Sequence, residues 1–146
     1  MAVTIKDVKN MSTKTLTFSI MDGPFEQART TTTFRMIHEA IERGYNVNVF
    51  AYEGAVSLAF AHQKPHANAV HGRTVEEEDH PLTKDWIAAL QEKAKAKGCQ
   101  LDWINCGLCV DERGVDDAIP GCRRGAPSDL WKWASESDGT LIIGTN

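Results

Sequence analysis

Short β-rich runs alternate with helical segments along most of the chain, and this alternation limits the folds open to it. The β-rich runs are interrupted by turn residues, and they lie at 15–21, 45–52, 100–105 and 140–143. Apolar residues recur at helical spacing between them, at 28–43, 55–61, 83–97 and 127–137. This order predicts an α/β fold in which helices cover both faces of a mainly parallel sheet.

Boundary signals place several of these elements. Gly44 and Gly98 follow helical segments, as expected for residues that end helices. Thr83 is expected to cap the N-terminus of the helix that runs to Lys97. The sites of parallel sheets gather at the carboxyl ends of their strands. The Asp22-Gly23-Pro24 turn, Glu53-Gly54 and Asn105-Cys106 all follow strands, so we expect them to lie at one edge.

Length and charge narrow the class of protein. The chain has 146 residues and no internal repeat, which predicts one domain over 1–146, with 1–13 as a flexible arm. Its net charge of −4 argues against nucleic acid as a partner. No apolar run approaches the roughly 18 residues of a membrane helix, and the N-terminus lacks a signal-peptide pattern. We therefore expect a cytoplasmic protein without a membrane partner.

Four cysteines, all in the last third of the chain, are the residues most informative about function. In a reducing cytoplasm they are not expected to form a disulfide framework. They therefore indicate packing, metal binding or thiol chemistry. The four are Cys99, Cys106, Cys109 and Cys122.

The segment that begins at Cys106 favours thiol chemistry. Cys106 is placed at the end of a strand and the start of a helix, where free backbone N–H groups and the helix dipole stabilise a thiolate. Cys109 follows one helical turn later, within reach of Cys106. Arg113 adds positive potential that Asp111 and Glu112 oppose. Cys106, Cys109 and Arg113 are thus the candidate catalytic residues.

Other interpretations of the same cysteines remain open. A structural zinc site needs two further ligands, and no second C-x-x-C is present. A thioredoxin-type C-x-x-C follows the first strand, whereas this one follows the third. All four thiols could also be buried as small apolar groups.

Three stretches together resemble the DsrE/DsrF-like family of sulfur-relay proteins, which includes the TusD type. They are the strand ending in DGP, the segment RGYNVNVFAYEGAV and the strand ending in NCGLCVDERGV, and they span roughly residues 15–115. In this family a cysteine after the third main strand carries sulfur as a persulfide. By its spacing to Arg113-Gly114, Cys106 matches that cysteine.

The resemblance implies a cytoplasmic persulfide carrier that needs no cofactor. Its partner would be a sulfur-carrier or sulfur-utilising protein, and the family's assembly as homotrimers or homohexamers is expected here. Cys109 is an extra thiol, which could resolve the persulfide or hold the sulfur in turn. Two alternatives are retained: a non-catalytic oligomeric binding or metal-binding protein of the same fold, and a dithiol oxidoreductase.

Three further features are assigned less directly. The His62–His80 segment, longer than the family's usual connection, is interpreted as an exposed acidic loop, with a metal site or a contact to the reactive cysteine as alternatives. Trp131 and Trp133 cannot face the same way on one helix, so one is a candidate for an oligomer interface. The basic stretch 121–125 is predicted to be a mobile surface loop, or a contact for an anion or the sulfur site.

Overall fold

A computed structural model describes residues 13–145 of the chain. Within that range five parallel strands form one sheet in the order β4-β3-β2-β1-β5. They are β1 (Thr15–Ile20), β2 (Asn46–Ala51), β3 (Leu101–Cys106), β4 (Cys122–Gly125) and β5 (Gly139–Ile143). The predicted α/β class and parallel sheet are confirmed. The N-terminal segment 1–13, predicted to be flexible, lies outside the described residues except for Thr13.

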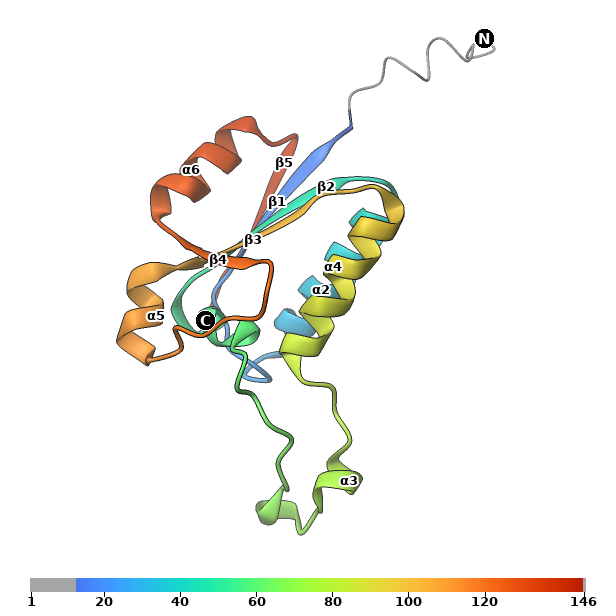
Figure 1. Ribbon diagram of the computed structural model, residues 1–146, viewed down its shortest axis with the longest axis vertical. Helices are drawn as coiled ribbons and strands as arrows, with labels where there is room; N and C mark the ends of the chain where they lie inside the picture. Colours follow the sequence, from blue (N-terminus) through green and yellow to red (C-terminus); the bar gives the residue numbers. More distant parts are fainter. Residues whose placement is uncertain (1–12, 146) are drawn as a thin grey trace.

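Helices cover both faces of this sheet, as predicted (Figure 1). One face carries α2 (Ala28–Glu42) and α4 (Thr83–Lys97), which lie side by side. The other face carries α5 (Gly107–Arg113) and α6 (Pro127–Glu136). No helix among residues 13–145 combines the length and the apolar character that crossing a membrane requires.

The apolar periodicity of α2 explains the main core. Phe34, Ile37 and Ile41 are fully buried against the sheet, and each contributes about 1.5–3 kcal/mol through burial. Trp103, on the sheet face that packs against α2, is also buried, and its indole N–H donates to Asn105 Oδ1 at 3.1 Å. A separate small cluster under α5 contains Phe50, Val56, Ile104, Val110 and the two thiols of the Cys106 segment.

Two local predictions are wrong. Leu82, not Thr83, is the N-cap of α4, because the buried Thr83 hydroxyl donates to Leu58 O at 2.8 Å instead of capping the helix. The basic stretch 121–125 is not a mobile loop, since Cys122–Gly125 forms the edge strand β4 beside β3. The short helix expected at 55–61 is a 3₁₀ helix, η1 (Glu53–Ala59).

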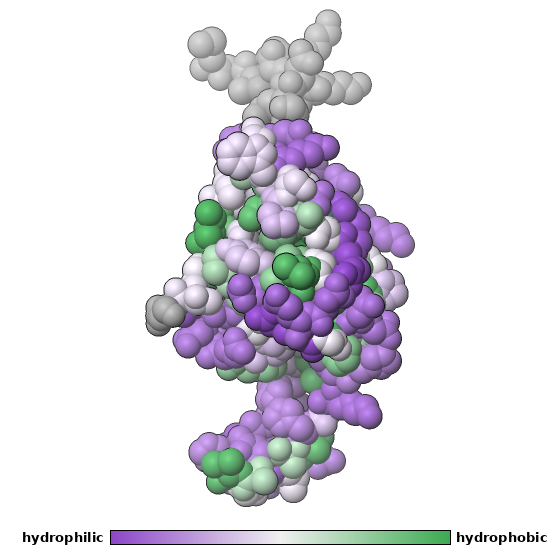
Figure 2. Space-filling model, turned by 90° about the vertical axis from the view of Figure 1, so that its left-hand side faces the viewer, coloured by the Kyte–Doolittle hydropathy of each residue, from purple (hydrophilic) through white to green (hydrophobic). Residues whose placement is uncertain are grey.

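The connection between η1 and α4 projects from the body (Figure 1), and it forms a separate lobe at the foot of the space-filling view (Figure 2). We call residues 62–80 the arm. Most of its residues are exposed, in agreement with the predicted loop. It is nevertheless structured, because it contains a 3₁₀ turn, η2 (Ala69–His71), and a short helix, α3 (Val75–Glu78). A capping box formed by Thr74 and Glu77 fixes the start of α3.

Candidate functional site

The carboxyl ends of β1, β2 and β3 meet at one edge of the sheet, which we call the carboxyl edge. Parallel pairing places Ile20 beside Ala51, and Ala51 beside Asn105. The loops after β1 and β2 also touch, because Ala55 N donates to Met21 O at 2.9 Å. The predicted gathering of these strand ends is therefore observed.

Cys106 lies at this edge as the last residue of β3 and the N-cap residue of α5. Its side chain is almost buried, with 7% of its surface exposed. β4 pairs with β3 up to this point and places Gly125 beside Cys106. Gly107 allows close packing where α5 begins, since a Cβ there would lie 3.2 Å from the Arg124 guanidinium.

Cys106 and Cys109 lie together in the buried cluster under α5, and both thiols are free. Burial raises the pKa of Cys109, and the neighbouring Cys106 thiol raises it further, while a backbone hydrogen bond from Glu53 lowers it. Burial is the largest of these effects, so Cys109 holds its proton. Cys106 therefore has a protonated thiol as its neighbour in this cluster.

Glu53 also belongs to the site, although the sequence predicts for it only a place at the same edge and no role beside the cysteines. Its backbone N–H approaches the Cys109 sulfur, and its carboxylate accepts a 2.8 Å hydrogen bond from Arg113. Its φ of 50° lies in the left-handed region, which is unusual for a residue with a side chain. Strained backbone of this kind is concentrated at functional sites.

The structure brings Arg113 to the same edge, where its charge is shared between two carboxylates. Besides the ion pair with Glu53, it lies 3.5 Å from Glu112, and it donates to Cys109 O at 3.4 Å. Arg113 thus ties η1 to the helix that carries Cys109. A cavity of about 530 Å³ opens beside it, lined also by Asp22, Glu26 and Glu53.

Arg124, from the edge strand β4, holds α5 from the other side. Its guanidinium binds Asp111 at 2.9 Å, Asp116 at 2.7 Å and Gly107 O at 3.2 Å. These ion pairs lower the pKa of Asp111 and raise that of Arg124. Its neighbour Arg123 binds Asp102 at 2.9 Å. Both arginines of the predicted basic loop are therefore engaged with carboxylates.

The remaining two cysteines lie apart from this pair. Cys122 accepts a weak hydrogen bond from Gln91, and burial raises its pKa to about 12. The Cys99 thiol lies 3.7 Å from Ile41 O. Over residues 13–145, no three His, Cys, Asp or Glu side chains are grouped so as to hold a metal ion.

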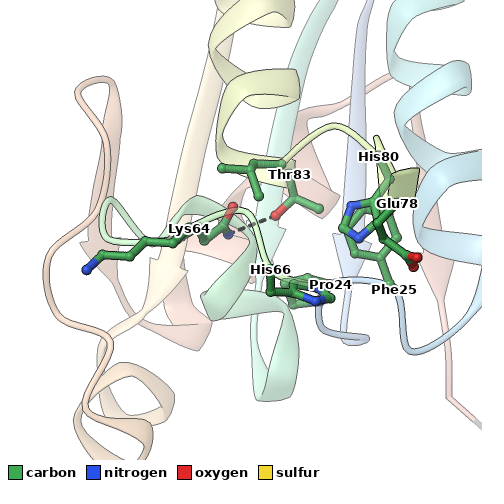
Figure 3. A pocket seen from close by; sticks show the side chains of 9 residues that line it. Pro24, Phe25, Lys64, His66, Glu78, His80 and Thr83 are labelled. Carbon is green, nitrogen blue, oxygen red and sulfur yellow. Dashed lines mark hydrogen bonds between the residues drawn. The ribbon is translucent and has the colours of Figure 1, made fainter. Parts of the chain in front are cut away.

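The histidines of the arm contact other groups. His62 pairs with Asp117, and the His66 and His80 rings lie 5.3 Å apart beside a cavity at the base of the arm (Figure 3). The two tryptophans of α6 face different ways, as predicted. Trp131 is 79% exposed, whereas Trp133 packs against the cluster under α5.

Known proteins resemble this chain over most of its length. The model of the DsrE/DsrF-like family matches residues 14–142. Protein MK0008 of Methanopyrus kandleri is 26% identical over 130 residues, which is 88% of this chain and 93% of that protein.

Solved structures share the fold at low sequence identity. The ychN protein from E. coli has a TM-score of 0.68 and 17% identity, covering 89% of this chain and 99% of its own. Protein MTH1491 from Methanobacterium thermoautotrophicum has a TM-score of 0.64 and 10% identity, covering 89% of this chain and 99% of its own.

Proposed function

The chain belongs to the DsrE/DsrF-like family, and on that premise we propose that it is a sulfur-relay protein. Cys106 carries sulfur as a persulfide and passes it to a partner protein. One observation supports this role above the others: Cys106 ends β3 at the carboxyl edge and shares a buried cluster with a second free thiol. This is the edge at which parallel α/β sheets carry their sites.

The transfer is an exchange between sulfurs. The Cys106 thiolate attacks the outer sulfur of a donor persulfide, so a bond forms from Cys106 Sγ to that sulfur and the donor's S–S bond breaks. The electron pair of the broken bond leaves on the donor thiolate. An acceptor thiolate then repeats the attack on the same outer sulfur and regenerates the Cys106 thiolate. The exchange involves no net oxidation and needs no bound cofactor.

Cys109 has two roles in this proposal. While it is protonated, its S–H donates toward Cys106 and stabilises negative charge on that sulfur. Once deprotonated, Cys109 attacks Sγ of a loaded Cys106, releases hydrosulfide and leaves a disulfide. The two thiols lose two electrons in that step and the transferred sulfur gains them. The raised pKa of Cys109 makes this step slow, so transfer to a partner is favoured.

Arg113 supports the site through position more than through free charge. Its bonds to Glu53 and to Cys109 O hold η1 against α5. Glu53 in turn directs its N–H at the Cys109 sulfur. In the same proposal the protein works in the cytoplasm, assembles as a homotrimer or homohexamer, and meets a sulfur-carrier or sulfur-utilising protein.

Intact mass spectrometry after exposure to polysulfide tests the proposal. We expect wild type and Cys109→Ser to gain sulfur that a reductant removes, and Cys106→Ser to gain none. Cys99→Ser is the matched control, since it removes a thiol outside the carboxyl edge. Equal loading of wild type and Cys106→Ser would contradict the proposal.

The proximity of the two thiols in one cluster also favours a second candidate, a dithiol oxidoreductase. This candidate predicts that wild type forms a reversible Cys106–Cys109 disulfide with a defined potential and retains no sulfur, whereas Cys109→Ser lacks the resolving thiol and keeps sulfur on Cys106. The same mass measurement separates the two, because a persulfide adds mass whereas a disulfide removes two hydrogens.

A further inference from the structure

We propose that a cavity at the base of the arm binds a small primary amine that carries an apolar body. We call it the arm cavity; it has a volume of about 470 Å³, within the range of small-molecule sites. The loop after β1 forms one wall, and the two ends of the arm form the others (Figure 3). The proposal does not depend on the sulfur chemistry at Cys106.

The walls of the arm cavity are largely apolar and aromatic. Phe25 and His80 lie with their ring centroids 4.4 Å apart, and His66 adds a third ring 5.3 Å from His80. Pro24 and Leu82 complete this lining. Flat rings and aliphatic groups of this kind bind the apolar body of a ligand, and the face of Phe25 attracts a cation.

Two buried polar atoms beside these rings have no hydrogen-bond partner among the described residues. They are Oε2 of Glu78 and Nδ1 of His80. Arg73 forms an ion pair with that Glu78 oxygen, but at 3.9 Å the separation is too long for a hydrogen bond. Leaving buried polar atoms unpaired is unfavourable, so a ligand that pairs them gains affinity.

The chemistry of these atoms selects the ligand. An ionised carboxylate only accepts hydrogen bonds, and the unprotonated nitrogen of a neutral histidine also accepts. An ammonium group has three donors and a positive charge, so it suits a cavity lined by such acceptors. The ammonium of Lys64 does not fill this role, because it is directed away from the other lining side chains (Figure 3).

The backbone supports a built site at this position. Phe25 has a φ of 59°, so an aromatic residue is held in a conformation that suits glycine. The neck of the arm is also fixed: Gln63 donates to Ser57 O at 2.7 Å and to Thr83 Oγ1 at 2.8 Å. The Phe25 ring is therefore held against His80 of the arm before any ligand arrives.

Calorimetric titration with three probes of similar shape tests this proposal. Phenethylamine is the cation, phenethyl alcohol its neutral counterpart and phenylpropionate the anion. We expect saturable millimolar or tighter binding of the amine, at least about tenfold weaker binding of the alcohol, and none of the anion. Equal affinity for amine and alcohol, or no saturable binding of the amine, would overturn the proposal.

Variants place the binding within the arm cavity. Glu78→Gln keeps the shape and removes the charge, so amine affinity should fall about tenfold or more. Glu76→Gln, the same change on an exposed side chain of α3, should leave it within twofold. Phe25→Gly removes an aromatic wall at a φ that glycine prefers, so it should fold and lose binding. If Glu78→Gln and Glu76→Gln bind the amine equally, the assignment to Glu78 is wrong.

Discussion

Replacing Gly125 with alanine should loosen the edge of the sheet that covers Cys106. A Cβ at Gly125 would lie 2.5 Å from a methyl of Ile104 and 2.6 Å from Oδ2 of Asp129. Asp129 accepts a 2.8 Å hydrogen bond from Ala126 N at the start of α6, so the added methyl group also disturbs that cap. The backbone at Gly125 has no positive φ, so the effect is one of space.

The expected magnitude follows from these contacts. Overpacking costs about 1–3 kcal/mol, and a weakened helix cap about 0.5–2 kcal/mol. The reduced entropy of the unfolded chain offsets about 0.4–1 kcal/mol. Gly125→Ala should therefore lower the free energy of unfolding by about 1–3 kcal/mol, or Tm by about 3–10 °C.

Urea unfolding followed by circular dichroism measures this change. Gly144→Ala is the control, because a Cβ there meets nothing within 4 Å, and it should stay within about 0.5 kcal/mol of wild type. β4 pairs with β3 at Cys106, so Gly125→Ala should also speed alkylation of Cys106. If both variants unfold at the same urea concentration, the packing argument is refuted.

Four other outcomes are expected. Burial raises the pKa of Cys122 from 9.0 to about 12. At pH 8 its alkylation should therefore be about a thousandfold slower in the folded than in the unfolded protein. Alkylation followed by mass mapping of each cysteine would measure the two rates. Hydrogen bonds from Lys93 and Lys97 lower the pKa of Glu42 from 4.5 to about 2. The stability advantage of wild type over Glu42→Gln should therefore be complete above pH 4.5 and vanish as the pH falls toward 2. Urea titrations at each pH would measure this change. Because Glu53 has a φ of 50°, Glu53→Gly should be about 1 kcal/mol more stable than Glu53→Ala. Both variants lose the ion pair with Arg113, so equal stability would rule out backbone strain at this position. Arg113 and Arg124 near Cys106 are each shared by two carboxylates. In low salt, cationic cystamine should therefore modify Cys106 about tenfold faster than anionic dithiodipropionate. Added salt should reduce the ratio of the two rates.

Elements with strong periodicity could be predicted from the sequence. Phe34, Ile37 and Ile41 define one face of α2, and their burial follows from that spacing. The strand β4 could not be predicted in this way, because Cys-Arg-Arg-Gly lacks the β-branched pattern of a strand. Its position is fixed by pairing with β3 and by the Arg123–Asp102 ion pair, which are long-range contacts.

The candidate site was predictable in part. Cys106, Cys109 and Arg113 lie within eight residues of one another, so local spacing was enough to propose them together. Glu53 and Arg124 come from distant parts of the chain and reach the site only through the order of the strands. Thr83 shows the same limit, because its bond to Leu58 O is formed by tertiary packing.

A sulfur-transfer experiment tests the relay most directly. The protein is loaded with heavy-isotope sulfur, freed of excess donor and mixed with an acceptor thiol, and the label in the acceptor persulfide and in free sulfide is measured by mass spectrometry. We expect label in the acceptor persulfide for wild type and Cys109→Ser, with less free sulfide from Cys109→Ser, and no transfer from Cys106→Ser. Label that leaves wild type only as free sulfide, or transfer that persists in Cys106→Ser, would contradict the account.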